Sequence, residues 1–62
     1  MTKRETLEQA TEHARTLVTD MERALKHASA LEADVLLDAI GDTRDLARRL
    51  EFMLADDEEN TR

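Results

Sequence analysis

Three side chains of this 62-residue sequence carry groups that commonly act as metal ligands or nucleophiles: His13, His27 and Ser29. Two histidines on a single helix share one metal ion only when they lie about one turn apart. His13 and His27 are 14 residues apart, which is about 21 Å along a helix at 1.5 Å per residue. The sequence also lacks cysteine and tyrosine and has no glycine-rich phosphate loop. We therefore expect no bound metal, no cofactor and no enzymatic activity.

Charged side chains in the second half of the sequence form a more informative pattern. Aspartates recur at intervals of four, four and three residues, which places them along one side of a helix: Asp34, Asp38, Asp42 and Asp45. Like charges four residues apart destabilise a helix by about 0.2–0.5 kcal/mol per pair, and aspartate is a poor residue for a helix interior. Leu37 and Phe52 lie beside this acidic line, with Arg44 and Arg48 between them.

This combination predicts a docking surface for a protein with a basic surface, because apolar anchors flanked by charges are typical of protein interfaces. The predicted partner-binding residues are Asp34, Leu37, Asp38, Asp42, Arg44, Asp45, Arg48 and Phe52. Three alternatives remain open for the same residues. They form a solvated face with two isolated apolar side chains, they make contacts within a tetramer, or they belong to an acidic mimic of nucleic acid that inhibits a nucleic-acid-binding protein.

The distribution of charge argues against a general nucleic-acid-binding protein. Residues 1–28 contain five basic and five acidic side chains, whereas residues 29–62 contain four basic and ten acidic ones. The whole net charge of −6 therefore belongs to the second half. Binding to a phosphate backbone depends on lysine and arginine displacing counterions, so nucleic acid is not an expected partner.

The overall composition predicts an all-α protein. There is no proline, one glycine and one aromatic residue, so the sequence offers neither strand-forming residues nor the turns that join strands. No apolar run approaches the length of about 20 residues that a membrane-spanning helix needs. With no cysteine and no apolar leader, we expect a cytoplasmic protein that does not contact membranes.

Apolar residues recur every three or four positions in both halves, which is typical of helices in a bundle. The first stripe is Leu7, Ala10, Ala14, Leu17, Met21, Ala24, Ala28 and Leu31, widened by Val18 and Leu25. The second stripe is Leu36, Ala39, Ile40, Thr43, Leu46, Ala47, Leu50, Met53 and Leu54. Its phase differs from the first by one residue, which indicates a break between the two.

The sequence Ser29-Ala30-Leu31-Glu32 has the form of a helix-starting capping box and locates that break. We predict a single helical-hairpin domain over residues 1–55, with helices at about 2–27 and 30–55 and a turn at about 28–30. Residues 56–62 form an acidic tail that should fray, because its carboxylates oppose the helix dipole. Two alternatives remain: a further break at Gly41-Asp42-Thr43, or one unbroken helix through the whole sequence.

A single hairpin cannot cover apolar stripes this wide, so we expect the antiparallel hairpin to form a homodimeric four-helix bundle. Small domains without disulfides or metals often depend on such association for stability. The predicted dimer core is Leu7, Leu17, Val18, Met21, Leu25, Leu36, Ile40, Leu46, Leu50 and Met53.

Three short segments resemble the Rop family of plasmid copy-number regulators: Met1-Thr2-Lys3, Leu31-Glu32-Ala33-Asp34 and Asp56-Asp57-Glu58-Glu59-Asn60. The resemblance implies an antiparallel dimer of helical hairpins that binds paired RNA loops. That family holds RNA with lysines, polar and aromatic residues of its first helix. In this sequence only Lys3 matches those positions, and the central ones are apolar or acidic.

These observations favour a small, non-catalytic regulatory or adaptor protein that acts by protein–protein interaction through the second helix. The main alternative is a Rop-like RNA-binding modulator of plasmid or phage origin, which would use the basic residues Lys3, Arg4, Arg15, Arg23 and Lys26. A third possibility is a purely structural oligomerisation module, for which neither surface matters.

Overall fold

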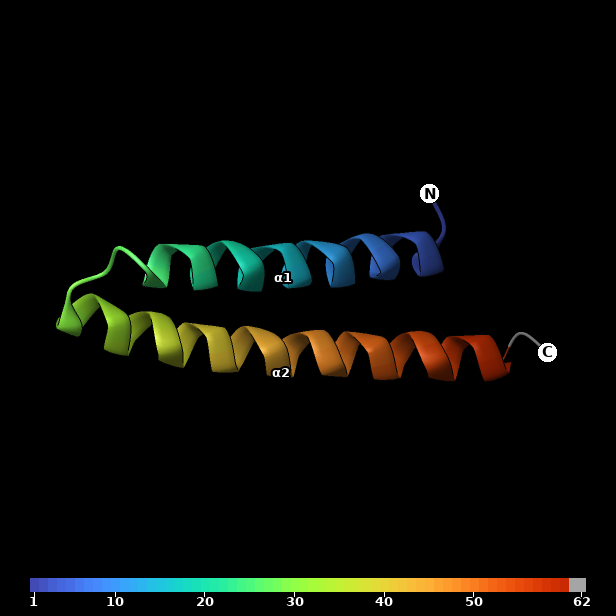
Figure 1. Cartoon of the computed structure of the whole chain (residues 1–62). Helices are drawn as coiled ribbons and strands as arrows, with labels where there is room; N and C mark the ends of the chain where they lie inside the picture. Colours follow the sequence, from blue (N-terminus) through green and yellow to red (C-terminus); the bar gives the residue numbers. More distant parts are fainter. Residues whose placement is uncertain (61–62) are drawn as a thin grey trace.

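The computed structural model describes residues 1–60, and side chains for residues 1–57. Two helices, α1 (Lys3–Leu25) and α2 (Ala30–Asn60), lie side by side and run in opposite directions (Figure 1). The prediction of an all-helical hairpin is confirmed. The hairpin measures 49 × 18 × 11 Å, and its smallest dimension equals the diameter of one helix. Each helix therefore has one neighbour, and both broad faces of the hairpin reach the surface.

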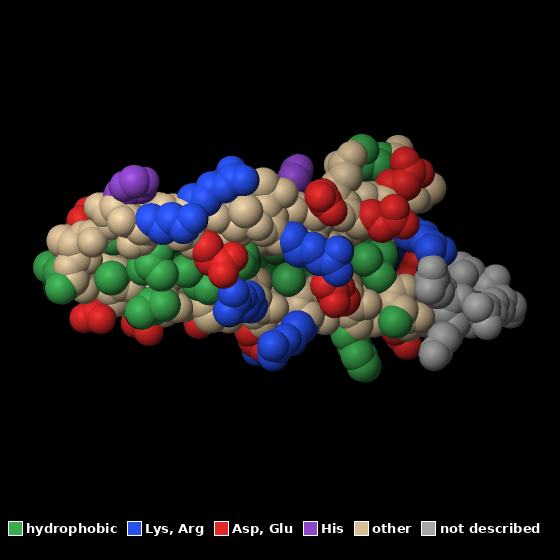
Figure 2. Space-filling model, viewed as in Figure 1, with side chains coloured by type: hydrophobic (Ala, Val, Ile, Leu, Met, Phe, Trp, Pro, Cys, Tyr) green, Lys and Arg blue, Asp and Glu red, His purple; other side chains and the backbone are tan. Residues whose placement is uncertain are grey.

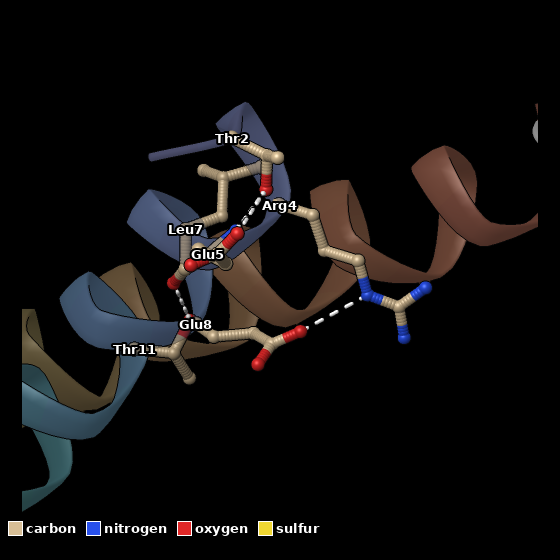
Figure 3. Close-up of polar contacts among 6 residues, drawn as sticks. All are labelled: Thr2, Arg4, Glu5, Leu7, Glu8 and Thr11. Carbon is tan, nitrogen blue, oxygen red and sulfur yellow. Dashed lines mark hydrogen bonds and ion pairs between the residues drawn. The ribbon is translucent and has the colours of Figure 1, made fainter.

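Both ends of α1 satisfy their backbone groups locally. The hydroxyl of Thr2 accepts a hydrogen bond from the backbone N–H of Glu5 at 3.1 Å and so caps the first turn (Figure 3). Arg4 and Glu8 form an ion pair at 3.0 Å one turn further on. At the other end, the N–H groups of residues 26–28 bond to the carbonyls three residues before them, which closes the last turn. The helix ends two residues earlier than predicted, and the connection to α2 is correspondingly longer.

The capping box at the start of α2 is present. The backbone N–H of Ser29 donates to a carboxylate oxygen of Glu32 at 2.9 Å, and the N–H of Glu32 donates to the Ser29 hydroxyl at 3.3 Å. The hydrogen bond from the Ser29 backbone, and secondarily the interaction with the Ser29 side chain, lowers the pKa of the Glu32 carboxyl. The box fixes where α2 begins and thereby the reversal of the chain.

The helices meet along a seam in which small residues predominate at the centre. Seam positions follow a heptad on each helix: Leu7, Thr11, Ala14, Val18, Met21 and Leu25 on α1, and Ala33, Leu36, Ile40, Thr43, Ala47, Leu50 and Leu54 on α2. The most buried of these are Thr11, Ala14, Val18, Ile40 and Ala47. The two threonines at the seam bond to their own helices. The Thr11 hydroxyl lies 2.8 Å from the Leu7 carbonyl (Figure 3), and the Thr43 hydroxyl lies 2.7 Å from the Ala39 carbonyl.

The seam uses only part of the stripe expected on the first helix. Leu7, Ala14, Val18, Met21 and Leu25 belong to that stripe and line the seam, and Thr11 joins them. Ala10, Leu17 and Ala24 of the same stripe lie at its edge, on a surface that a single hairpin leaves uncovered. Both sets fit a spacing of three and four residues. In the hairpin the interhelical contact falls on the set that contains Thr11, whose hydroxyl is hydrogen-bonded to its own helix.

Two findings concern the extent of α2. The helix continues through Gly41 as predicted, because that glycine keeps an ordinary right-handed conformation, and the alternative of a break there is excluded. The helix also ends at Asn60 instead of residue 55, since Leu54 and Asp57 continue the seam heptad and no helix-breaking residue intervenes. The part of the tail at residues 61–62 lies outside the described residues. The alternative of one unbroken helix is excluded by the turn at residues 26–29. Over the described part of the chain, neither helix is long and apolar enough to cross a membrane.

The capping box leads to a test of stability. We expect Ser29→Ala to lower the free energy of unfolding by about 1 kcal/mol at neutral pH. Because folding lowers the pKa of Glu32, its contribution is complete above the ordinary glutamate pKa and is lost as pH falls through the folded value. The stability that the carboxylate contributes, measured as the difference between wild type and Glu32→Gln, should therefore shrink in acid. Urea unfolding at neutral and acidic pH measures it, and a difference that stays constant would contradict this role of the box.

Candidate interaction surfaces

One broad face of the hairpin is closed by ion pairs between the helices. Arg15 on α1 bonds to Glu51 on α2 through Nε at 3.1 Å and through a second guanidinium nitrogen, and this hydrogen bond raises the pKa of Arg15. In the opposite sense, Arg44 on α2 bonds to Glu22 on α1 at 2.8 Å. Figure 2 shows this face, with basic and acidic side chains meeting along the line between the helices. We refer to it as the ion-pair face.

Exposed ion pairs of this kind contribute only about 0–1 kcal/mol each to stability. Their location is more informative than their energy, because both ion pairs lie over the interhelical seam on the same broad face. They flank a shallow groove whose lining is Arg15, Val18, Arg44, Ala47, Arg48 and Glu51. The ion-pair face is therefore polar at its rim, and its apolar floor is short.

The opposite broad face is apolar and has no ion pair between the helices among the described residues. On α1, Ala10, Leu17 and Ala24 recur at intervals of seven residues, and Leu31 in the first turn of α2 lines the same hollow as Ala24. On α2, apolar side chains on the same side are Val35, Ala39, Leu46, Leu50 and Met53. We call this set of nine residues the apolar face.

Two shallow hollows lie in the apolar face. One is lined by Ala10, His13, Ala14, Leu17, Thr43, Leu46 and Leu50, and the other by Ala24, His27, Ala28, Leu31, Glu32, Val35 and Leu36. Leu17 and Leu46 share the first hollow and are 49% and 51% exposed, while Val35 in the second is 64% exposed. Large aliphatic side chains that remain half or more exposed around concave hollows are typical of an interface.

The residues predicted to form a dimer core divide between the seam and this face. Those in the seam are Leu7, Val18, Met21, Leu25, Leu36, Ile40 and Leu50. The other three, Leu17, Leu46 and Met53, are exposed in the single hairpin and lie on the apolar face, joined at its edge by Leu50. Sequence analysis did not single out Val35. Val35 precedes Leu46 by 11 residues, or three helical turns, and this spacing could have placed it on the same side of the helix as Leu46.

The eight predicted partner-binding residues all lie exposed on α2. Asp42 borders the apolar face, since it lies three residues after Ala39 and four before Leu46, and the other seven lie further from that face. Leu37 and Phe52 are 55% and 75% exposed. Arg44 differs from the rest because its guanidinium is held by Glu22 and lies at the border of the ion-pair face. Asp45 pairs with Arg49 at 3.0 Å. The structure thus brings these residues onto one side of α2, and their role in binding stays a prediction.

The basic residues that RNA binding would use are largely engaged with carboxylates. Arg4 pairs with Glu8, and Arg15 pairs with Glu51. Arg23 lies 3.9 Å from Asp20. Such neighbours reduce the positive charge available to phosphate groups.

Both histidines are exposed at the rim of the apolar face, in separate hollows. No group of three or more histidine, cysteine, aspartate or glutamate side chains that could hold a metal ion occurs within the described residues. Comparisons of the chain with protein-family models, with curated proteins and with solved structures found no match. The surfaces themselves therefore provide the basis for a functional proposal.

Proposed function

We propose that this chain is a non-catalytic adaptor or regulatory protein that works as a homodimeric four-helix bundle and presents the outer surface of α2 to another protein. The observation that carries the proposal is the difference between the two broad faces. The ion-pair face is closed by Arg15–Glu51 and Arg44–Glu22, whereas the apolar face exposes Leu17, Leu46 and Val35 without a cover.

A second copy of the hairpin is the occupant that fits the apolar face. Two such faces brought together give each helix two neighbours in place of one, which is the arrangement of a four-helix bundle. The ion-pair faces then lie outside, where the charged side chains keep their contact with water. A chain of this size buries a limited share of its surface alone, so burial against a second copy would supply much of its stability.

The order of large and small side chains favours an antiparallel pair of hairpins. Along α1 the apolar face alternates between alanine and leucine at Ala10, Leu17 and Ala24. In a parallel pair, equal residues would meet, so that leucine faces leucine and alanine leaves a gap beside alanine. In an antiparallel pair centred between residues 17 and 24, Leu17 of one copy packs against Ala24 of the other. Alternation of this kind fills a core without voids.

The outer surface of α2 remains available in this dimer. Leu37 and Phe52 lie on the side of α2 toward the ion-pair face, away from Leu46 and Met53. Each dimer would carry two such surfaces related by the twofold axis. Two equivalent surfaces on a small rigid bundle suit a protein that recruits or bridges other proteins.

Dimerisation can be tested by substituting a charged residue at the centre of the apolar face. We expect the melting temperature of the wild type to rise with protein concentration, because association stabilises the folded state by mass action. Leu17→Glu should abolish this dependence and lower the midpoint, since the carboxylate would be buried in the interface. Leu37→Glu is the matched control on the other side of the hairpin and should melt like wild type. Thermal unfolding followed by circular dichroism decides the matter, and a wild-type midpoint for Leu17→Glu would contradict the proposal.

The antiparallel arrangement is tested by a distance between copies. The chain has no cysteine, so Gln9→Cys gives one spin label per copy at an exposed position. With the twofold axis between residues 17 and 24, the two labelled positions should lie about 35 Å apart along the bundle at 1.5 Å per residue. In a parallel pair they would lie within about two helix diameters, or 20 Å. Double electron–electron resonance distinguishes these distances, and the shorter one would rule out the antiparallel pair.

A further inference from the structure

Gly41 is a residue for which the hairpin itself provides no explanation. It lies within the continuous helix α2, is exposed and has no positive φ. A Cβ atom added at this position would meet nothing within 4 Å. Glycine in a helix interior costs about 0.5–1 kcal/mol relative to alanine, so the folded chain would be more stable with alanine here. What a glycine does offer is an unobstructed approach to the helix backbone from outside.

Gly41 lies within a row of residues along one side of α2, which we call the docking row: Leu37, Gly41, Arg44, Arg48 and Phe52. Their spacing of four, three, four and four residues keeps them on one side of the helix. Leu37 and Phe52, both more than half exposed, stand about 22 Å apart at the two ends, with the glycine notch between them. Apolar side chains on either side of an open notch suit a partner that lies along the row and comes closest to α2 at its middle.

The docking row and the surface beside it differ in charge. On one flank of the row lies the acidic line, in which the carboxylates of Asp34, Asp38 and Asp42 form no ion pair or hydrogen bond with any described residue and only that of Asp45 is paired, with Arg49. Within the row, Arg44 is neutralised by Glu22, while Arg48 has no carboxylate partner among the described side chains. A partner that complements this surface needs cations along the acidic flank and a carboxylate near Arg48.

We propose that the docking row binds an amphipathic helix of a partner protein, with lysine or arginine along the flank that faces the acidic line. A helix fits because the backbone groups of α2 are hydrogen-bonded within the helix, so that recognition depends on side chains alone. About 15 residues of helix span the 22 Å of the row. A small residue of the partner lies over Gly41, and its larger apolar residues contact Leu37 and Phe52. This inference rests on the role proposed above for the outer surface of α2.

The probe is a fluorescently labelled synthetic helical peptide of about 18 residues. It has a leucine stripe with alanine at its centre, lysine along one flank and glutamate along the other. A second peptide has glutamate at every lysine position. We expect the lysine peptide to bind the full chain at least tenfold more tightly than the all-glutamate peptide, with an association rate that falls as salt is added. Fluorescence anisotropy measures both affinities.

Variants of the full chain then locate the site. Gly41→Gln should raise the melting temperature and weaken peptide binding at least tenfold, because glutamine favours the helix but blocks the notch. Thr16→Gln on the outer side of α1 is its control and should leave binding unchanged. Asp38→Asn with Asp42→Asn should weaken binding several-fold. The matched pair Glu8→Gln with Glu12→Gln, which has the same spacing and the same loss of charge, should not.

Equal affinity for the two peptides, or a Gly41→Gln chain that binds within twofold of wild type, would overturn the inference. Amide chemical shifts that change only around Leu17 and Leu46 would also overturn it, since the peptide would then be covering the apolar face. The oligomeric state is measured separately by sedimentation. A dimer that does not bind the peptide refutes this inference alone, whereas a monomer that binds it at Gly41 refutes the dimer and leaves the docking row standing.

Discussion

The feature on which the rest of the structure depends is that each helix has a single neighbour. The hairpin is 11 Å thick, one helix diameter, so every side chain outside the narrow seam reaches the surface on one broad face or the other. No described side chain is completely buried, and the most buried ones all lie in the seam: Thr11, Ile40, Ala14, Ala47 and Val18. In a structure of this kind, the larger apolar side chains that do not fit in the seam are exposed on the broad faces.

The small residues of the seam explain how the two faces became different. Alanine and hydrogen-bonded threonine at the centre let the helices approach closely, and this excludes larger side chains such as Leu17 and Leu46 from the space between them. Those leucines project to one side, where no ion pair between the helices closes the described surface. On the other side Glu22 and Glu51 reach across to arginines of the opposite helix. The same packing that holds the hairpin together therefore creates the surface that a second copy can cover.

Much of the fold could be predicted from local chemistry. The capping box at Ser29 located the start of α2 because its two hydrogen bonds depend only on residues 29–32. The choice of seam was not predictable in this way. On α1 a set beginning Leu7, Thr11 and Ala14 and one beginning Leu7, Ala10 and Ala14 both have helical spacing, and apolar composition favours the second. The structure selects the first, since the Thr11 hydroxyl bonds to the Leu7 carbonyl and is no obstacle to burial. Similarly, glycine followed by aspartate suggested a break at Gly41, but helical neighbours on both sides carry the helix through it.

The candidate sites were partly visible in the sequence for the same reason. Leu37, Phe52 and the acidic line are periodic features of one helix, so their shared side followed from spacing alone. The contrast between the two broad faces involves both helices and required their relative rotation, which only the tertiary structure gives. The most direct test of the account is the mass of the full chain in solution. Sedimentation equilibrium at micromolar concentration should give about 14 kDa, twice the chain mass of 7.1 kDa. A folded, helical species at the mass of one chain would contradict it.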